Sequence, residues 1–462
     1  MTGRPDQAGQ VEEAQAFIST HPGVRFVEII FTGLNGVSRG KRLRIHELEP
    51  IYRQGRFLPT STLVADITGR DVEESGLVWD NGDADVVGWP VPGSLVLAPW
   101  LGADVAQVTI TLHDLDGTPS DLDPRQVLAK VVSRFAADGL TPVLACELEY
   151  YLVDMRRTAD GGVQLLPDPR TNAQPWGHNA YGLRELDDNG EFLRDLWAGA
   201  DAQGIPLEGA ISEYAPGQIE LTLKHQPDAL RAADQAVLYK RLAKGTALRH
   251  RAEATFMAKP FAELSGSGLH VHVSVNDADG RNIFASPLDA VTETLKHAIG
   301  GMRMLAGSSM AIFAPNANSY RRFRANSYAP VSSAWGVNNR TVPFRIPAGG
   351  DAGRHVEHRI AGADAHPYLA TAAILAAIHY GMANAVDPGP AVTGNGYADD
   401  APADAMPTDW LEAIRAFERD SVLADYLGER FVRMYAIVKR AEYARFNEVV
   451  TALDYDWYLR TA

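Results

Sequence analysis

Residues 142–153 read PVLACELEYYLV, an apolar run typical of a strand that two glutamates interrupt. In a strand, Glu147 and Glu149 point to the same face because side chains alternate. Two carboxylates on one inner face repel each other unless a cation lies between them. An edge strand with both glutamates on its solvated side explains the same pattern, so this motif alone leaves both interpretations open.

Three further segments carry comparable side chains: a Pro-Gly hairpin at 213–220 (EYAPGQIE), a strand at 266–274 (GSGLHVHVS) and a strand at 356–360 (VEHRI). Each segment has a simpler explanation. The first can be a surface hairpin, the second a half-exposed strand face, and the third a surface ion pair. The side chains expected to share a face or to meet across the turn are Glu213 with Glu220, His270 with His272 and Ser274, and Glu357 with Arg359.

Five carboxylates and a histidine on strands form a ligand set that Mg²⁺ or Mn²⁺ prefers over zinc. Two ions are implied, because such a pair neutralises phosphate oxygens and aligns the attacking and leaving groups in phosphoryl transfer. Arginines between residues 321 and 359 suit bidentate contacts to carboxylate and phosphate, although a solvated basic face is the alternative. They are Arg321, Arg322, Arg324, Arg340, Arg345, Arg354 and Arg359.

The composition restricts the partners. The 462 residues include 43 Lys and Arg and 58 Asp and Glu, which gives a net charge of −15. This charge disfavours binding to nucleic acid and to anionic membrane surfaces. A single cysteine, Cys146, and an N-terminus without a signal-like apolar core favour a cytoplasmic protein. The most apolar segment, residues 368–385, is rich in alanine and predicts a buried helix, not a membrane span. Phosphate-loop, dinucleotide-turn, zinc-protease and nucleophile-elbow motifs do not occur in the sequence.

Turn signals divide the chain. A hairpin over residues 24–43 opens a β-rich part that continues to the turn-rich stretch 114–123, after which Asp123-Pro124 begins a helix. We therefore predict a small N-terminal β-domain at residues 1–118 and a larger mixed domain at residues 119–462. Further strands are predicted at 94–100 and 105–113, further helices at 192–203, 227–251 and 287–306, and a C-terminal helical cap at 410–419 and 428–445.

These motifs, followed by Asn339-Arg340 and Arg345-Ile346-Pro347, occur in the order found in glutamine synthetases and extend over most of the chain. The chain resembles that family. The resemblance implies an α+β fold with a small N-terminal β-grasp domain and a large catalytic domain, whose curved antiparallel sheet is flanked by helices. It also implies a ring oligomer, typically a dodecamer, with active sites between subunits. ATP would phosphorylate the glutamate side chain, and an amine would attack the γ-glutamyl phosphate.

The resemblance also assigns residues by their positions in the motifs. Glu149, Glu213 and Glu220 resemble the ligands of one metal ion, and Glu147, His270 and Glu357 those of the other. Gly266, Arg322 and Arg359 resemble the glutamate-binding residues. The ATP-binding candidates are Glu208, His272, Ser274, Arg340 and Arg345, and the catalytic candidates are Arg322, Arg340 and Tyr328.

The departures concern the amine. Two acidic groups that hold ammonium in glutamine synthetases are missing, and the predicted amine pocket is instead formed by Leu58, Pro59, Thr60, Ser61 and Tyr328. A desolvated ammonium ion without anionic partners is strongly penalised. The sequence thus resembles the branch that makes γ-glutamyl-amines, and a short monoamine such as ethanolamine is favoured. A polyamine, ammonium itself and a non-catalytic structural role are the alternatives. Ala352 stands where the family has a lysine near the nucleotide. Arg354 is expected to supply the missing positive charge.

Overall fold

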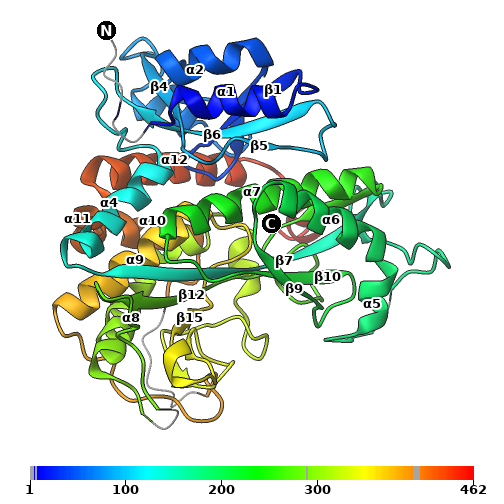
Figure 1. The fold of residues 1–462 in the computed structure, drawn as a ribbon. Coiled ribbons are helices and arrows are strands. Elements are labelled where there is room, and N and C mark those ends of the chain that lie inside the picture. Colours follow the sequence, from blue (N-terminus) through cyan, green and yellow to red (C-terminus); the bar gives the residue numbers. More distant parts are fainter. Residues whose placement is uncertain (1–4, 6–7, 176, 288–289, 399–405) are drawn as a thin grey trace.

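The structure is a computed structural model that describes residue 5 and residues 8–175, 177–287, 290–398 and 406–462. Its strands form two sheets, and Figure 1 shows the N-terminal sheet on one side of helices α4, α7 and α12 and the larger sheet on the other. Along the chain, β6 is the last strand of the first sheet, and helix α4 then leads to β7, the first strand of the second sheet. The expected domain boundary between residues 118 and 119 lies between β6 and α4 and stays a prediction.

The first sheet has the order β2-β1-β6-β4-β3, with β5 added to β6, and β1 runs parallel to β6. The predicted hairpin is confirmed, since β1 and β2 are antiparallel and Gly36 has the positive φ of +77° that their connection requires. The strand expected at 94–100 is reduced to two residues, because Pro99 cannot donate to a ladder and Ser94 bonds back to Val91. The strands are β1 Phe26–Thr32, β2 Ser38–Arg44, β3 Arg56–Pro59, β4 Asp85–Pro90, β5 Val96–Leu97 and β6 Val105–His113.

The second sheet has the order β13-β14-β15-β12-β7-β10-β9, with β8 and β11 also paired to β7. All of its pairs are antiparallel except β13 with β14, so the predicted α+β class with a mainly antiparallel catalytic sheet is confirmed. The strands are β7 Thr141–Arg157, β8 Val163–Leu165, β9 Leu207–Ser212, β10 Gln218–Leu223, β11 Ala252–Thr255, β12 Leu269–Asn276, β13 Trp335–Val337, β14 Phe344–Ile346 and β15 Val356–His358.

The predicted helices form, with some changes at their ends. The side chain of Asp123 caps α4, and Thr292 caps α8, which therefore begins later than expected and continues to Phe313. The C-terminal helical cap is confirmed and gains α11. The helices are α1 Val11–Thr20, α2 Leu48–Gln54, α3 Ser61–Val64, α4 Pro124–Ala137, α5 Leu183–Asp188, α6 Gly190–Ala202, α7 Ala229–Arg249, α8 Glu293–Phe313, α9 Pro367–Ala383, α10 Trp410–Arg419, α11 Ser421–Leu427, α12 Glu429–Asn447 and α13 Ala452–Tyr458.

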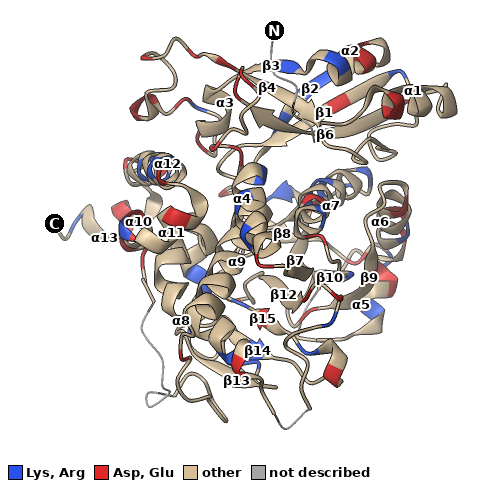
Figure 2. Ribbon diagram, turned by 60° about the vertical axis from the view of Figure 1, so that its left-hand side comes forward, with Lys and Arg blue, Asp and Glu red and all other residues tan. Residues whose placement is uncertain are grey.

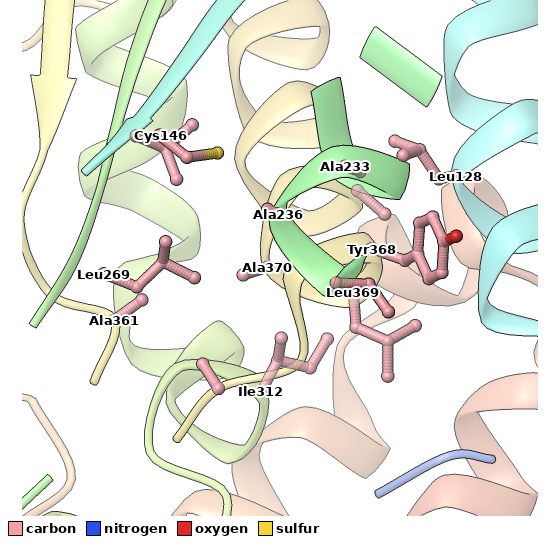
Figure 3. Packing of buried hydrophobic residues seen from close by; sticks show 14 of the residues in the cluster. Leu128, Cys146, Ala233, Ala236, Leu269, Ile312, Ala361, Tyr368, Leu369 and Ala370 are labelled. Atoms are coloured by element: carbon pink, nitrogen blue, oxygen red, sulfur yellow. The ribbon is translucent and has the colours of Figure 1, made fainter. Parts of the chain in front are cut away.

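Helix α9 forms the centre of the core, as its apolar sequence predicts. Figure 3 shows Leu369 and Ala370 among residues of α7, α8 and the second sheet, which contributes Cys146 of β7 to the same cluster. Gly301 and Gly381 let α8 and α9 approach closely, because a Cβ at either position would clash with the other helix's backbone. Among the described residues, no helix is both long and apolar enough to cross a bilayer.

Candidate active site

Four adjacent strands direct polar side chains to the sheet face opposite the helical core. On β7, Cys146 and Leu148 point to the core, and the alternate residues Glu147 and Glu149 therefore point away from it. The antiparallel register then brings the polar side chains of the neighbouring strands to the same face. Glu220 of β10 pairs with Glu149, His270 of β12 pairs with Glu147, and Glu357 of β15 pairs with His272.

The structure brings the expected metal ligands together. The ligand atoms of Glu149, Glu213 and Glu220 lie within 4.8 Å of one another, as one predicted set requires. The second set also converges, because His270 Nδ1 is 3.2 Å from Glu147 Oε2 and 3.8 Å from Glu357 Oε1. The two groups are not separate, since Glu147, Glu220 and His270 form a third triplet within 4.8 Å.

His272 was expected on the nucleotide side, and the structure also places it in this cluster. Its Nε2 atom is 3.0 Å from Glu147 Oε1, and the ligand atoms of Glu147, His272 and Glu357 lie within 4.8 Å of one another. Its other ring nitrogen, Nδ1, is 3.0 Å from His355 Nε2, so His272 lies between the carboxylate cluster and His355.

Crowding of buried carboxylates changes their acidity. Burial and the neighbouring Glu149 raise the pKa of Glu213 to about 7. Burial and the charges of Glu147, Glu149 and Glu213 raise the pKa of Glu220 well above its usual value. Such shifts show that this side of the cluster lacks positive charge. A divalent cation with oxygen ligands supplies that charge, so the residues present fit the predicted metal ions.

On the other side of the cluster, positive groups compensate the carboxylates. Burial alone would raise the pKa of Glu147, but hydrogen bonds with His270 and His272 lower it below its usual value. For Glu357, Arg359 and the same two histidines outweigh burial and hold the pKa at about 2.

Two arginines hold the Glu357 carboxylate. Arg345 donates from Nη1 to Oε2 at 2.8 Å, and Arg359 donates to Oε1. Arg345 was expected at the nucleotide, and in this structure its guanidinium contacts the proposed metal ligand Glu357. Three of the grouped arginines, Arg322, Arg345 and Arg359, are buried beside the cluster, whereas Arg321, Arg324 and Arg340 are exposed.

Glycines at 266 and 268 are explained by the position of Arg322. Its guanidinium donates to the carbonyl oxygens of Ile360 at 2.8 Å and Arg359 at 3.3 Å. A Cβ on Gly266 would lie 2.6 Å from Arg322 Cγ, and one on Gly268 would lie 2.8 Å from Arg322 Nη2. The glycines therefore let Arg322 lie directly against the strand that carries His270.

One positioning residue was not predicted. Gln218 Nε2 is 3.3 Å from Glu149 Oε2 and also donates to the Gly266 carbonyl at 3.0 Å. The backbone N–H of Gly268 donates to the same Glu149 oxygen at 2.8 Å. Gln218 lies within the sequence motif EYAPGQIE, but only the fold shows that its amide reaches Glu149 and the glycine-rich strand.

A cavity of about 600 Å³ lies beside the cluster and contains part of the expected nucleotide site. Ser274 and Ala352 line it together with His225 and His355, which the sequence did not single out. Glu208 is exposed on β9. The expected compensation by Arg354 is not seen, because its buried guanidinium donates to Ser286 Oγ and to the carbonyl oxygens of residues 287 and 290.

The expected amine-pocket residues are not in one place within a single chain. Residues 58–61 belong to β3 and the start of α3, and Figure 2 shows β3 in the upper sheet, far from β10 and β12. Leu58, Thr60 and Ser61 are buried, and the Thr60 hydroxyl donates to the Ala84 carbonyl at 2.6 Å. An acid that the sequence interpretation overlooked lies next to them: Asp83 Oδ1 accepts from the backbone N–H of Ser61 at 3.1 Å.

Tyr328 lies in the segment that follows Arg322. Its side chain is 62% exposed and its φ is +57°, a conformation that side chains rarely adopt. The next residue, Ala329, accepts a hydrogen bond of 3.0 Å from the Tyr397 hydroxyl. Tyr397 therefore attaches the loop at 394–397 to this segment.

Comparisons with known proteins identify the family of the chain. Residues 121–458 match the family described as "Glutamine synthetase, catalytic domain". The chain is 38% identical to the γ-glutamylputrescine synthetase PuuA of Escherichia coli (strain K12), over 98% of this chain and 95% of that protein. It is 34% identical to a glutamate–isopropylamine ligase of a Pseudomonas species, over 97% and 98%.

A solved structure described as "GmaS/ADP complex-Conformation 1" has the same fold, with a TM-score of 0.83, 30% identity and coverage of 96% of this chain and 98% of that one. The expected glutamine synthetase fold is confirmed. The chain belongs to the glutamine synthetase family of ATP-dependent, metal-dependent glutamate–amine ligases.

Proposed function

We propose that this protein ligates an organic primary amine to the side-chain carboxylate of glutamate through γ-glutamyl phosphate. The observation that carries the proposal is a contrast within the molecule. The buried carboxylate–histidine cluster and its arginines are complete, whereas residues 57–61 and the segment around Tyr328 provide no carboxylate for ammonium.

Two Mg²⁺ or Mn²⁺ ions are proposed to bind the cluster, one to Glu149, Glu213 and Glu220 and the other to Glu147, His270 and Glu357. When bound, such ions neutralise the phosphate oxygens and the charge that develops during phosphoryl transfer. The raised pKa values of Glu213 and Glu220 support this assignment, because these carboxylates gain most from a nearby cation.

The chain's own residues are proposed to orient the two substrates. Arg322 is held rigidly by backbone carbonyl oxygens, and together with Arg359 and the Gly266 backbone it would bind the carboxylates of glutamate. Fixed positive groups of this kind stabilise developing negative charge without reorganising. The cavity lined by Ser274 would hold ATP. His272, Arg345 and Glu208 do not line this cavity, and their roles in ATP binding stay predictions. Arg340, which is exposed, stays a prediction.

A short monoamine such as ethanolamine remains the first candidate for the nucleophile. Pro59, which is half-buried, offers an apolar contact, and the hydroxyl of Thr60, which donates to Ala84, still has lone pairs that can accept a hydrogen bond. The hydroxyl of Tyr328 is free to contact a polar group on the amine because the side chain is exposed.

A diamine such as putrescine is the second candidate, and two observations favour it. Asp83 lies against Ser61, in an acidic stretch at 71–85 that also contains Glu73, Glu74 and Asp80. A carboxylate there can pair with the distal ammonium of a diamine. In addition, the relative with 38% identity bears the name γ-glutamylputrescine synthetase.

The separation of β3 from the cluster supports an oligomer. Because residues 58–61 lie beyond helices α4, α7 and α12, they cannot reach the cluster of their own chain. We propose a ring, typically a dodecamer, in which β3 of one subunit completes the site of its neighbour. Light scattering on the purified protein measures the assembly size, and a monomer with full activity would contradict this arrangement. A cytoplasmic location remains a prediction that rests on the lone, buried Cys146.

An amine panel tests the proposal. Release of phosphate from ATP is measured with glutamate, Mg²⁺ and one amine at a time: ethanolamine, putrescine, spermine or ammonium. We expect at least one organic amine to give a higher kcat/KM than ammonium. Ammonium as the best substrate would support a plain glutamine synthetase. The absence of turnover with every amine, together with the absence of bound Mn²⁺, would support a structural role.

A further inference from the structure

Three histidines meet at the border between the carboxylate cluster and the neighbouring cavity. His225 follows β10, His272 lies on β12, and His355 immediately precedes β15. Each offers a ring nitrogen, and these three atoms lie within 4.8 Å of one another. The ring centroids are 5.1 Å apart for His272 and His355, 5.5 Å for His225 and His355, and 6.0 Å for His225 and His272. The three rings therefore surround one point.

Polar contacts of the outer ring nitrogens orient two of these rings. His355 Nδ1 is 2.6 Å from the Gly353 carbonyl oxygen and must donate to it, which leaves the Nε2 lone pair directed at His272. His272 Nε2 lies 3.0 Å from Glu147 Oε1, and His272 Nδ1 faces His355 Nε2 at 3.0 Å. In the tautomer with its proton on Nε2, His272 can offer the Nδ1 lone pair to a metal ion. Histidines that bind metal ions are held in this way, with the second nitrogen donating to a carbonyl or carboxylate oxygen.

The distances fit a tetrahedral metal ion. Imidazole nitrogens bound to one zinc ion at about 2.0–2.1 Å lie roughly 3.3 Å apart. His272 Nδ1 and His355 Nε2 are 3.0 Å apart without an ion, so only a small adjustment is needed. His225 is exposed, which leaves the fourth position open to solvent and gives an ion a route to the site.

We propose that His225, His272 and His355 form a separate site for a borderline transition metal ion such as Zn²⁺. An all-imidazole set suits Zn²⁺, whereas the oxygen-rich cluster suits Mg²⁺ or Mn²⁺. His225 and His355 line the same cavity as Ser274. An ion at this site therefore occupies space that the proposed function gives to ATP, and its effect on activity, which rests on that proposed function, is inhibition competitive with ATP.

Direct binding of Co²⁺ tests the site without any assay of activity. The full-length protein is freed of metal, saturated with Mg²⁺ to occupy the oxygen ligands, and titrated with Co²⁺ while the visible absorption is recorded. We expect the intense bands of tetrahedral Co²⁺, which added Zn²⁺ removes. Absence of these bands under Mg²⁺ saturation overturns the proposal.

Matched variants assign the signal to these histidines. His225→Gln and His355→Gln are expected to weaken Co²⁺ binding at least ~10-fold, because each removes one of three nitrogens. His46→Gln alters an exposed histidine on the N-terminal part of the chain and is expected to bind Co²⁺ like the parent protein. Because His225 is exposed, loss of folding is not an obstacle for that variant. Unchanged Co²⁺ spectra in both His225→Gln and His355→Gln overturn the proposal.

Kinetics test the consequence for ATP. Zn²⁺ is expected to raise the KM for ATP in the parent protein and to raise it less in His225→Gln, each compared with the same protein without Zn²⁺. Zn²⁺ that binds without changing this KM would contradict the location in the nucleotide cavity. If the protein proves inactive with every amine, the proposed function fails while the Co²⁺ measurement still decides whether the site exists.

Discussion

The carboxylate cluster and the amine-side segments are built in opposite ways. The cluster lies on four adjacent strands whose register fixes the relative positions of Glu147, Glu220, His270 and Glu357. The amine-side residues lie on a short strand of the other sheet and in the exposed segment around Tyr328. The difference is consistent with the proposed function, in which the sheet fixes the phosphoryl-transfer site and the choice of amine depends on segments outside that sheet, which can vary without disturbing the cluster.

Removing a cluster carboxylate should have the largest effect. Glu147→Gln keeps the shape of the side chain but removes a charge that contacts His270 and His272. We expect kcat/KM to fall by ~100-fold or more, because a metal ligand and the orientation of two histidines are lost together. Steady-state phosphate release measures it, and Glu12→Gln on the surface of α1 is the control. Retention of near-normal activity would show that the cluster is not the reaction site.

Metal binding should stabilise the folded protein against thermal unfolding. At 100 times its Kd, an ion that binds only the folded state contributes about 2.7 kcal/mol, which for a chain of 462 residues corresponds to a rise in Tm of about 3 °C. Thermal unfolding with EDTA and with Mn²⁺ provides the comparison. The rise should be smaller in Glu213→Gln, which loses one of three clustered carboxylates. An equal rise in both proteins would indicate that Mn²⁺ binds elsewhere.

A carboxylate at position 328 should shift the choice of amine. Tyr328→Glu places an anion in the exposed segment that follows Arg322, and we expect kcat/KM for ammonium to rise ~10-fold relative to that for ethanolamine. Tyr328→Phe tests the hydroxyl alone and should leave the ammonium value unchanged. An equal change for both amines in Tyr328→Glu would separate this residue from amine recognition.

The smallest expected effect distinguishes the two candidate amines. Asp83→Asn removes a charge but keeps an oxygen that can accept from the Ser61 N–H, and asparagine tolerates the φ of +52° at this position. If the amine is a diamine, the KM for putrescine should rise roughly 3- to 10-fold while that for ethanolamine stays constant. Equal KM values before and after the change would favour the monoamine.

Much of the cluster could be predicted because its parts are local. Spacing of two residues places Glu147 with Glu149, and His270 with His272, on one face of a strand in any fold. The pairing of these strands with each other rested on resemblance, and the register in the structure supports it. Gln218 and Asp83 were missed because each acts on a segment distant in the sequence. Arg354 was misjudged because nothing in its sequence neighbourhood predicts that its guanidinium donates to Ser286, Pro287 and Ala290.

The sequence by itself determined which side chains share a strand face and that α4 begins after Asp123. These properties depend on strand periodicity, on capping residues and on the identity of single residues, so they need no knowledge of distant neighbours. Only the tertiary structure decided that His272 connects Glu147 to His355, and that residues 58–61 lie away from the cluster in their own chain. Contacts of this kind depend on register and on the packing of segments far apart in sequence, which local patterns do not specify.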